Sequence, residues 1–189
     1  INVIVGDKVE FDDSNRSTDP GETIITINNE GDTDISFTDN ITNTFGDTRI
    51  TNNGGDILVT SSYVVIETKK FNVDAVLGQV GTADAAIKIV APIQTNSVEL
   101  DASTSGDLHI EQLTGNLKVG QITSLVGGVH LSTAGSIIDA DISDTTNITA
   151  KLIDLKSLSG TIGKLNNSLK IETQGAIAAL NAIAAGSIF

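Results

Sequence analysis

Aspartates and histidines are the side chains of this sequence that are best suited to chemistry. The aspartates gather in two places: Asp139, Asp141 and Asp144, and again Asp12, Asp13 and Asp19. Oxygen-rich loops of this kind can bind Ca²⁺. Neither group has the spacing of an EF-hand, and tight turns also favour Asp, because its side chain hydrogen-bonds to nearby backbone. Both groups are therefore calcium candidates, with turn residues as the competing interpretation.

The only two histidines, His109 and His130, each stand between two apolar residues. If the chain coils with a period equal to the spacing between them, both lie on the outer face of the coil, about 5 Å apart. Such a pair could hold a metal ion or respond to pH. No third ligand is evident nearby in the sequence, so a solvated ladder on the outer face is the simpler interpretation.

Catalytic residues are not evident. A polysaccharide lyase or hydrolase needs paired carboxylates, or a carboxylate with Arg or Lys, in a groove, and aromatic side chains usually help to hold the sugar. The chain has no Trp, one tyrosine (Tyr63) and two arginines (Arg16 and Arg49). It contains no nucleophile elbow, phosphate loop or zinc signature. We therefore predict no catalysis and no catalytic or cofactor-binding residue, with Ca²⁺ as the one cofactor to consider.

The charge excludes several classes of partner. The formal net charge is −13, and residues 1–50 are more acidic than the rest. Such a chain repels DNA and anionic membrane surfaces. No apolar run approaches the roughly 20 residues that span a bilayer, and no signal peptide is visible. We expect no nucleic-acid partner and no insertion into a membrane.

Short apolar–polar–apolar runs, such as Val129-His130-Leu131 and Ile153-Asp154-Leu155, dominate the chain. In a strand, this pattern places two apolar side chains on one face and the polar one opposite. Strands this short suit a coil to which each turn adds two or three of them. The runs that begin at Leu108 and Leu117 recur at Val129 and Ile137. The sequence thus predicts an all-β fold, a β-solenoid with turns of about 20 residues. A β-sandwich of short strands is the alternative, especially for residues 1–50.

The chain also repeats itself at a long, constant offset. Residues 68–81 align with residues 150–163, so that Phe71 falls on Ile153, Val80 on Ile162 and Gly81 on Gly163. Repeats of this kind indicate stacked units that share one core. We expect acidic, irregular turns or a cap over residues 1–50 and a solenoid over residues 51–189. The solenoid would hold two modules, each of about four turns or about 80 residues. Their ranges are about 55–134 and 135–189, and the second is incomplete.

One segment leaves the type of structure open. Residues 175–185 are rich in alanine and could form a helix. Their counterpart at residues 92–102 has the pattern of a strand, so we interpret the alanines as small side chains inside a tight coil.

The chain resembles the repeats of filamentous-haemagglutinin-like bacterial adhesins and related giant exoproteins, and the recognisable pattern lies at residues 106–189. The resemblance depends on the stretches Gly128-Val-His-Leu-Ser-Thr-Ala-Gly-Ser-Ile-Ile-Asp-Ala-Asp141, Asn147-Ile-Thr-Ala-Lys-Leu-Ile-Asp-Leu155 and Ser159-Gly-Thr-Ile-Gly163. It covers about residues 50–189. It implies a right-handed parallel β-helix, a secreted or cell-surface location and a scaffold or adhesive role. The N-terminal secretion domain that full-length members carry is not found in this sequence.

The function that follows as an expectation is an exported structural or adhesive rod, or a fibre-forming protein of the bacterial surface. Its partners would be further copies or repeats of itself, joined head to tail, and a host, sister-cell or matrix surface. The chain starts at Ile1 rather than Met, and residues 186–189 look like the opening of another repeat, so we expect a processed chain or a fragment. The alternatives are a polysaccharide-active β-helix, such as a lyase or a phage tailspike fragment, and a calcium-stabilised matrix protein.

Overall fold

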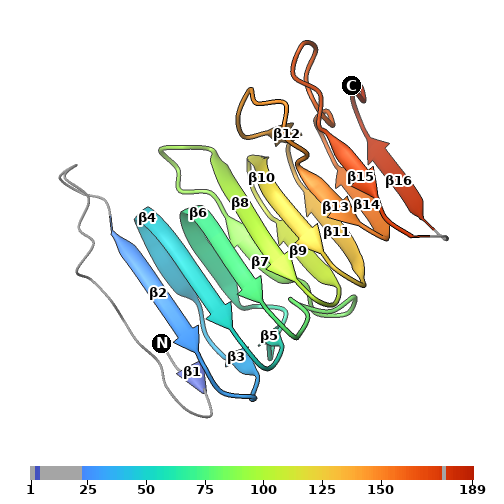
Figure 1. Cartoon of the computed structure of the whole chain (residues 1–189). Coiled ribbons are helices and arrows are strands. Elements are labelled where there is room, and N and C mark those ends of the chain that lie inside the picture. Colours follow the sequence, from blue (N-terminus) through green and yellow to red (C-terminus); the bar gives the residue numbers. More distant parts are fainter. Residues whose placement is uncertain (1–2, 5–22, 176–177) are drawn as a thin grey trace.

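The computed structural model describes residues 3–4, 23–175 and 178–189, and every regular element in these ranges is a β-strand (Figure 1). The calcium candidates Asp12, Asp13 and Asp19 lie outside the described residues. The strands are β1 (Val3–Ile4), β2 (Ile24–Asn29), β3 (Ile35–Phe37), β4 (Ile41–Asn52), β5 (Ile57–Val59), β6 (Val65–Ala75), β7 (Ile87–Val90), β8 (Ser97–Thr104), β9 (Leu108–Gln112), β10 (Asn116–Ser124), β11 (Gly128–Thr133), β12 (Ile137–Asp139), β13 (Ile148–Ala150), β14 (Leu152–Ser157), β15 (Ile171–Thr173) and β16 (Ala179–Ala184).

The strands stack into three parallel ladders, which we call faces A, B and C. Face A consists of β2, β13 and β15 with the C-terminal halves of β4, β6, β8 and β10. Face B consists of β3, β5, β9, β11, β14 and β16, bridged by Val80. The N-terminal half of β4 pairs with the N-terminal half of β6, which pairs with β7. Strand β7 in turn pairs with the C-terminal end of β9, so this short ladder continues into face B. Face C consists of the N-terminal halves of β8 and β10, then β12, Ile162 and Ile188.

The described chain makes seven coils of a β-solenoid, with the architecture of a right-handed parallel β-helix (Figure 1). One position of face A is occupied in successive coils by Ile27, Ile50, Val73, Ala102, Ile122, Ile148 and Ile171. The steps between these residues are unequal, because loops of different length leave the coil. The longest step runs from Val73 to Ala102 and the shortest from Ala102 to Ile122. At about 4.8 Å per coil, the stack is about 30 Å long.

The predicted β-solenoid is therefore confirmed, and the residues that the structure describes do not form the alternative β-sandwich. Within the described ranges, only β1 with β3 and the bridge between Lys164 and Asn167 pair antiparallel. Residues 24–52 belong to the first two coils, in register with the coils that follow. The alanine-rich segment forms strand β16, which pairs with β14 in the same parallel register.

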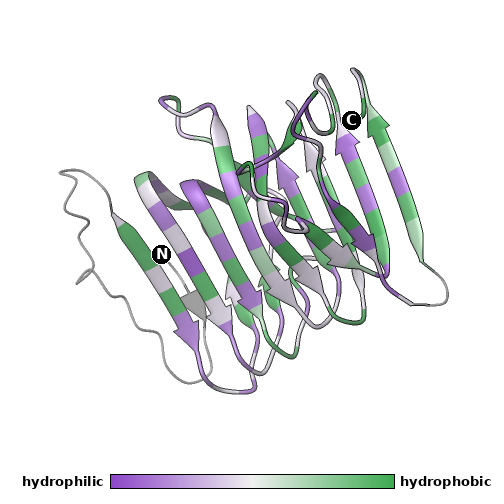
Figure 2. Cartoon of the chain, turned by 45° about the horizontal axis from the view of Figure 1, so that its top comes forward, coloured by the Kyte–Doolittle hydropathy of each residue, from purple (hydrophilic) through white to green (hydrophobic). Residues whose placement is uncertain are grey.

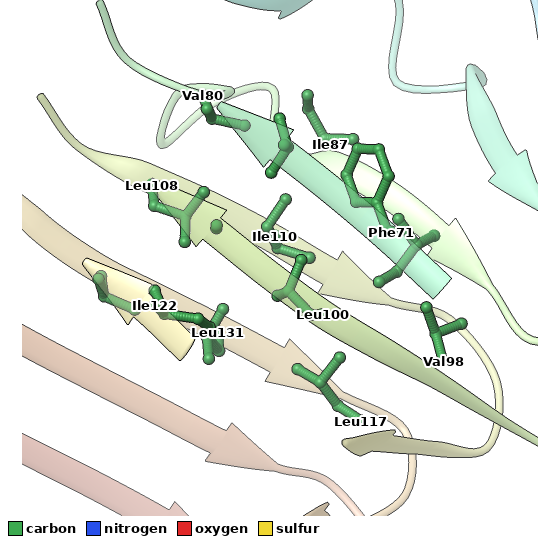
Figure 3. Packing of buried hydrophobic residues seen from close by; sticks show 14 of the residues in the cluster. Phe71, Val80, Ile87, Val98, Leu100, Leu108, Ile110, Leu117, Ile122 and Leu131 are labelled. Atoms are coloured by element: carbon green, nitrogen blue, oxygen red, sulfur yellow. The ribbon is translucent and has the colours of Figure 1, made fainter. Parts of the chain in front are cut away.

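Branched aliphatic side chains fill the inside of the coils. Hydrophobic and hydrophilic residues alternate along the strands (Figure 2), so that every second side chain points inward. Figure 3 shows the middle of this column, where Phe71, Leu100, Ile110 and Leu131 converge from neighbouring coils. Each is at most 2% exposed. Burial of this continuous column is the main stabilising contribution, since apolar area removed from water stabilises by about 25 cal/mol per Å².

Buried hydroxyl groups satisfy the backbone at the corners of the coils. Thr104 donates to the carbonyl of Gly78, Ser124 to that of Gly106 and Ser157 to that of Gly135, at 2.6–2.7 Å. The Ser124 and Ser157 oxygens also accept hydrogen bonds from the backbone N–H groups of Gly127 and Gly160. Each hydroxyl therefore links its own corner to the corner of the preceding coil. The ladder hydrogen bonds between strands end at the corners, so these side-chain bonds replace them there.

The long sequence repeat preserves the local backbone but moves it to another face. Phe71 lies on face A, whereas its counterpart Ile153 lies on face B; Val80 lies on face B, whereas Ile162 lies on face C. Both copies contain a strand, a corner and a glycine of positive φ, 65° at Gly81 and 76° at Gly163. The repeated unit is therefore a strand with its corner, which fits more than one side of the coil.

The last coil leaves inward-facing residues uncovered. In β16, Leu180 continues the column of Val129 and Ile153, which are fully buried, but Leu180 is 53% exposed. Ile188 continues the column of Ile137 and Ile162 in the same way and is 55% exposed. The strand edges of β15 and β16 that face away from the stack have no partner strand among the described residues. The last coil therefore exposes apolar side chains and open strand edges together.

Candidate functional site

A groove of about 880 Å³ runs over the outer side of face A. Its floor consists of outward side chains of β4, β6, β8 and β10, and the loop between β12 and β13 borders it. The lining residues are Asp47, Arg49, Ile50, Thr51, Lys70, Asn72, Val73, Asp74, Glu99, Asp101, Ala102, Ser103, Gly120, Gln121, Thr123, Ala140, Asp141 and Thr145. Sequence reasoning missed this groove, because its residues come from several coils and share no motif.

Lys70 lies at the centre of an ion-pair cluster in the groove. Its Nζ is 2.6 Å from Oε1 of Glu99 and 2.7 Å from Oδ2 of Asp101, which stand on the neighbouring strand. Burial by itself would lower the pKa of Lys70. Hydrogen bonds to Asp101 and Glu99 and the attraction of both carboxylates outweigh it and raise the pKa. Lys70 is thus held as a cation by two carboxylates and is not a free base.

Two polar side chains of the groove lack partners. The Nδ2 atom of Asn72 is buried and donates no hydrogen bond to the described residues. The carboxylate of Asp74, two residues along β6 on the same outward side, forms no ion pair or hydrogen bond within the described part of the chain. Burial without a compensating cation raises the pKa of the Asp74 carboxyl. Asn72 and Asp74 therefore stand on the same side of β6 without a side-chain partner among the described residues.

The histidine ladder on the outer side of face B is confirmed. His109 and His130 are paired in register, their ring centroids are 4.3 Å apart and their planes differ by 2°. Nδ1 of His130 is 3.7 Å from Oδ2 of Asp154 in the next coil, and Nδ2 of Asn181 donates to Asp154 Oδ1 at 2.8 Å. Burial, and then the neighbouring His130, lower the pKa of His109, against a smaller opposite effect of Asp107. Parallel stacked rings direct their nitrogen lone pairs side by side and not toward one shared point.

The calcium candidates near the C-terminal end of the chain do not converge. The Asp139 side chain is fully buried, and its Oδ2 atom is 3.2 Å from Nζ of Lys170. Its Oδ1 atom accepts hydrogen bonds from Asn147 Nδ2 at 2.8 Å and from the backbone N–H of Asp141 at 3.1 Å. The Asp141 side chain instead caps the backbone N–H of Ser143. In the part of the chain that the structure describes, no three acidic, His or Cys side chains gather as a metal site.

Lys170 and Asn147 are the residues that determine the role of Asp139, and the sequence pattern did not point to them. Lys170 also donates to the Ser143 carbonyl at 2.7 Å, and Asn147 donates to the Val119 and Gly120 carbonyls. Asn147 and Lys170 precede a pair of strands in register, β13 and β15, so they are neighbours across the coil boundary. Together they hold the loop between β12 and β13 beside the groove.

Comparison with known proteins gives no match to a family model, to a curated protein or to a solved structure. The structure itself defines the class of fold, a parallel β-solenoid, and shows an open groove on face A. No described segment is a helix with the length and apolar character needed to cross a membrane.

Proposed function

We propose that this chain is a structural and adhesive rod, exported to the bacterial surface or the extracellular space. The stack of coils supports a rigid spacer, because each coil is hydrogen-bonded to the coil before and after it. The outward ladders of Thr, Asn, Asp and Lys support a solvated exterior. The resemblance to adhesin repeats is the reason for choosing surface export over other uses of a solenoid.

The observation that carries the proposal is the uncovered last coil. Leu180 occupies a column that is fully buried one and two coils earlier, and in the last coil more than half of it is exposed. Open strand edges together with apolar side chains favour the addition of another coil. That coil would be supplied by continuing repeats or by a second copy placed head to tail.

The test is the shape and assembly state of the purified chain. Negative-stain images and sedimentation velocity should show elongated particles that lengthen as the concentration rises. The substitution Leu180→Gln should shift this equilibrium to monomers, because it places a polar amide on the uncovered end. Ile183→Gln is the matched control, since Ile183 is equally exposed but points outward from the same strand. A compact monomer at every concentration would contradict the assembly.

A polysaccharide-active protein is the competing function, and the groove over face A favours it. Carboxylates and an amine line the groove, as such chemistry requires. Lys70, however, is engaged by Glu99 and Asp101 and has a raised pKa. Assays for new reducing ends with neutral and acidic polysaccharides distinguish the two functions, because a purely adhesive rod releases none.

A further inference from the structure

A lysine, an asparagine and a buried aspartate meet at the boundary between the last two described coils. Asn147 and Lys170 are neighbours across this boundary, because each precedes a strand of the paired β13 and β15. Nζ of Lys170 donates to Oδ2 of Asp139 at 3.2 Å, and Nδ2 of Asn147 donates to Oδ1 of the same carboxylate at 2.8 Å. One carboxylate therefore holds together an amine and a carboxamide, two groups that can condense to a new amide.

The other hydrogen bonds of Asn147 fix the orientation of its side-chain amide. Nδ2 also donates to the carbonyls of Val119 and Gly120, each at 3.2 Å. Oδ1 accepts the backbone N–H of Lys170 at 2.9 Å. The reverse orientation would place an NH₂ group against an N–H donor. The nitrogen that would leave therefore lies on the Asp139 carboxylate, and the amide oxygen lies on a backbone donor.

The surroundings of this cluster favour a reaction between its members over hydrolysis. The Asp139 side chain is fully buried, and Asn147 is 3% exposed. Exclusion of water removes the competing nucleophile, and the fixed neighbours replace a chance encounter with a standing one. The Lys170 side chain is 26% exposed, so a released ammonia has a path to solvent.

We propose that Lys170 and Asn147 join in an intramolecular isopeptide bond, with Asp139 as the catalytic residue. A proton passes from Nζ of Lys170 to Oδ2 of Asp139, and the neutral amine attacks Cγ of Asn147. The backbone N–H of Lys170 stabilises the negative charge that develops on Oδ1 of Asn147. The Asp139 carboxyl then protonates Nδ2, the Cγ–Nδ2 bond breaks and ammonia leaves.

This step balances without another reactant. One bond forms between Nζ and Cγ, and one breaks between Cγ and Nδ2. The ammonium group of Lys170 carries three protons, of which one stays on the new amide and two pass through Asp139 to the leaving nitrogen. The leaving group departs as ammonium, and Asp139 returns to a carboxylate. The product joins the last described coil covalently to the coil before it.

The experiment is the intact mass of the purified full chain, followed by digestion with trypsin. The denatured chain should be lighter than its sequence predicts by one molecule of ammonia. Trypsin should not cleave after Lys170, because the side chain is then an amide and no longer a cation. The peptide of residues 119–151 should be joined to the peptide that begins at residue 165, and fragmentation should place the bond between Asn147 and Lys170.

Variants separate the reaction from a static ion pair with the same contacts. Lys170→Arg keeps a cation beside Asp139 but supplies no amine nucleophile, so its mass should equal the mass of its sequence. Asp139→Asn removes the proton acceptor and should also keep its full mass. Lys164→Arg, at an exposed position nearby, is the matched control and should lose ammonia as the parent does.

The proposal is overturned if the parent has its full sequence mass or if trypsin releases the free peptide of residues 165–170. It is also overturned if Lys170→Arg loses ammonia, because the loss would then arise at another residue, such as a cyclised Asn53 before Gly54. The parent chain alone decides the first outcome, so the test holds even where Asp139→Asn fails to fold. None of these outcomes depends on whether the chain assembles into a rod.

Discussion

Asp139 is a buried carboxylate that its own neighbours satisfy at the base of the loop between β12 and β13. Lys170 supplies a cation, and Asn147 and the Asp141 backbone supply hydrogen bonds. The Lys170 side chain is 26% exposed, so water screens part of the attraction. The carboxylate still needs its partners, because a buried charge without them is unfavourable by several kcal/mol.

We predict that Asp139→Ala lowers the free energy of unfolding by about 2–4 kcal/mol, because it leaves Lys170 and Asn147 without their shared acceptor. Urea titration measures the change. Asp144→Ala is the control at an exposed position of the same loop and should stay within about 0.5 kcal/mol of the parent. Equal effects of the two substitutions would show that the ion pair is not what stabilises the loop.

Calcium should not raise the melting midpoint through these aspartates, because the Asp139 oxygens are already bound to Lys170, Asn147 and Asp141. Melting curves in CaCl₂ and in EDTA, for the parent and for Asp139→Ala, measure this. A higher midpoint in CaCl₂ that Asp139→Ala abolishes would instead support the calcium-stabilised alternative.

The stacked histidines should make stability depend on pH on the acid side. The pKa of His109 lies below its ordinary value of 6.5. The unfolded chain therefore takes up protons at a higher pH than the folded chain does. The stability from this residue is complete above pH 6.5 and is lost as the pH falls from there through the lower folded pKa. The variant His109→Gln, in urea titrations from pH 7.5 down to pH 5, about the range in which histidine titrates, should show a shallower loss than the parent. Curves of equal slope would disprove the prediction.

At the scale of the elements, the corners of the coils tolerate fewer residue types than the strands do. The strands accept any inward branched residue, whereas Gly81 must adopt a φ of 65° beside the next coil. A methyl group there would lie 2.7 Å from the His109 carbonyl oxygen. Gly175 also has a positive φ, 95°, but the nearest atom to an added methyl group is Lys151 Cγ at 3.8 Å.

The two glycines allow backbone strain and steric contact to be separated. We predict that Gly175→Ala costs about 1 kcal/mol, the penalty of a left-handed residue alone. Gly81→Ala should cost about 2–4 kcal/mol, because the strain and the clash with the next coil combine. Thermal and urea unfolding measure both. If both variants lose the same stability, the contact with the His109 carbonyl is not a constraint.

The elements were largely predictable from the sequence, because inward and outward residues alternate within each strand. The runs around His130 and Asp154 predicted strands, faces and the stacked histidine pair, all of which depend on local pattern. The groove and the pairing of Asp139 with Lys170 were not predictable. They depend on which residues of different coils meet, and loops of unequal length change that register, as the long step between Val73 and Ala102 illustrates.

At the scale of the whole molecule, stability should vary along the stack. Coils in the middle are paired on both sides, whereas β2 and β16 are each paired on one side among the described residues. Because each coil contacts only its neighbours, end coils open without the rest. We predict that amide hydrogen exchange, followed by mass spectrometry, is slowest in β6, β8 and β9 and fastest in β2 and β16. Uniform exchange rates would indicate a single cooperative unit instead.

The ladder hydrogen bonds also determine how the molecule would bear load. They run from coil to coil, parallel to the long direction of the stack. A force that pulls the two termini apart therefore strains the bonds of one coil at a time and not many in parallel. Each coil that detaches releases a loop of chain that extends to about 70–100 Å, at about 3.3–3.6 Å per residue. As a tether, the protein would lengthen in steps and absorb mechanical shock while its remaining coils keep their shape.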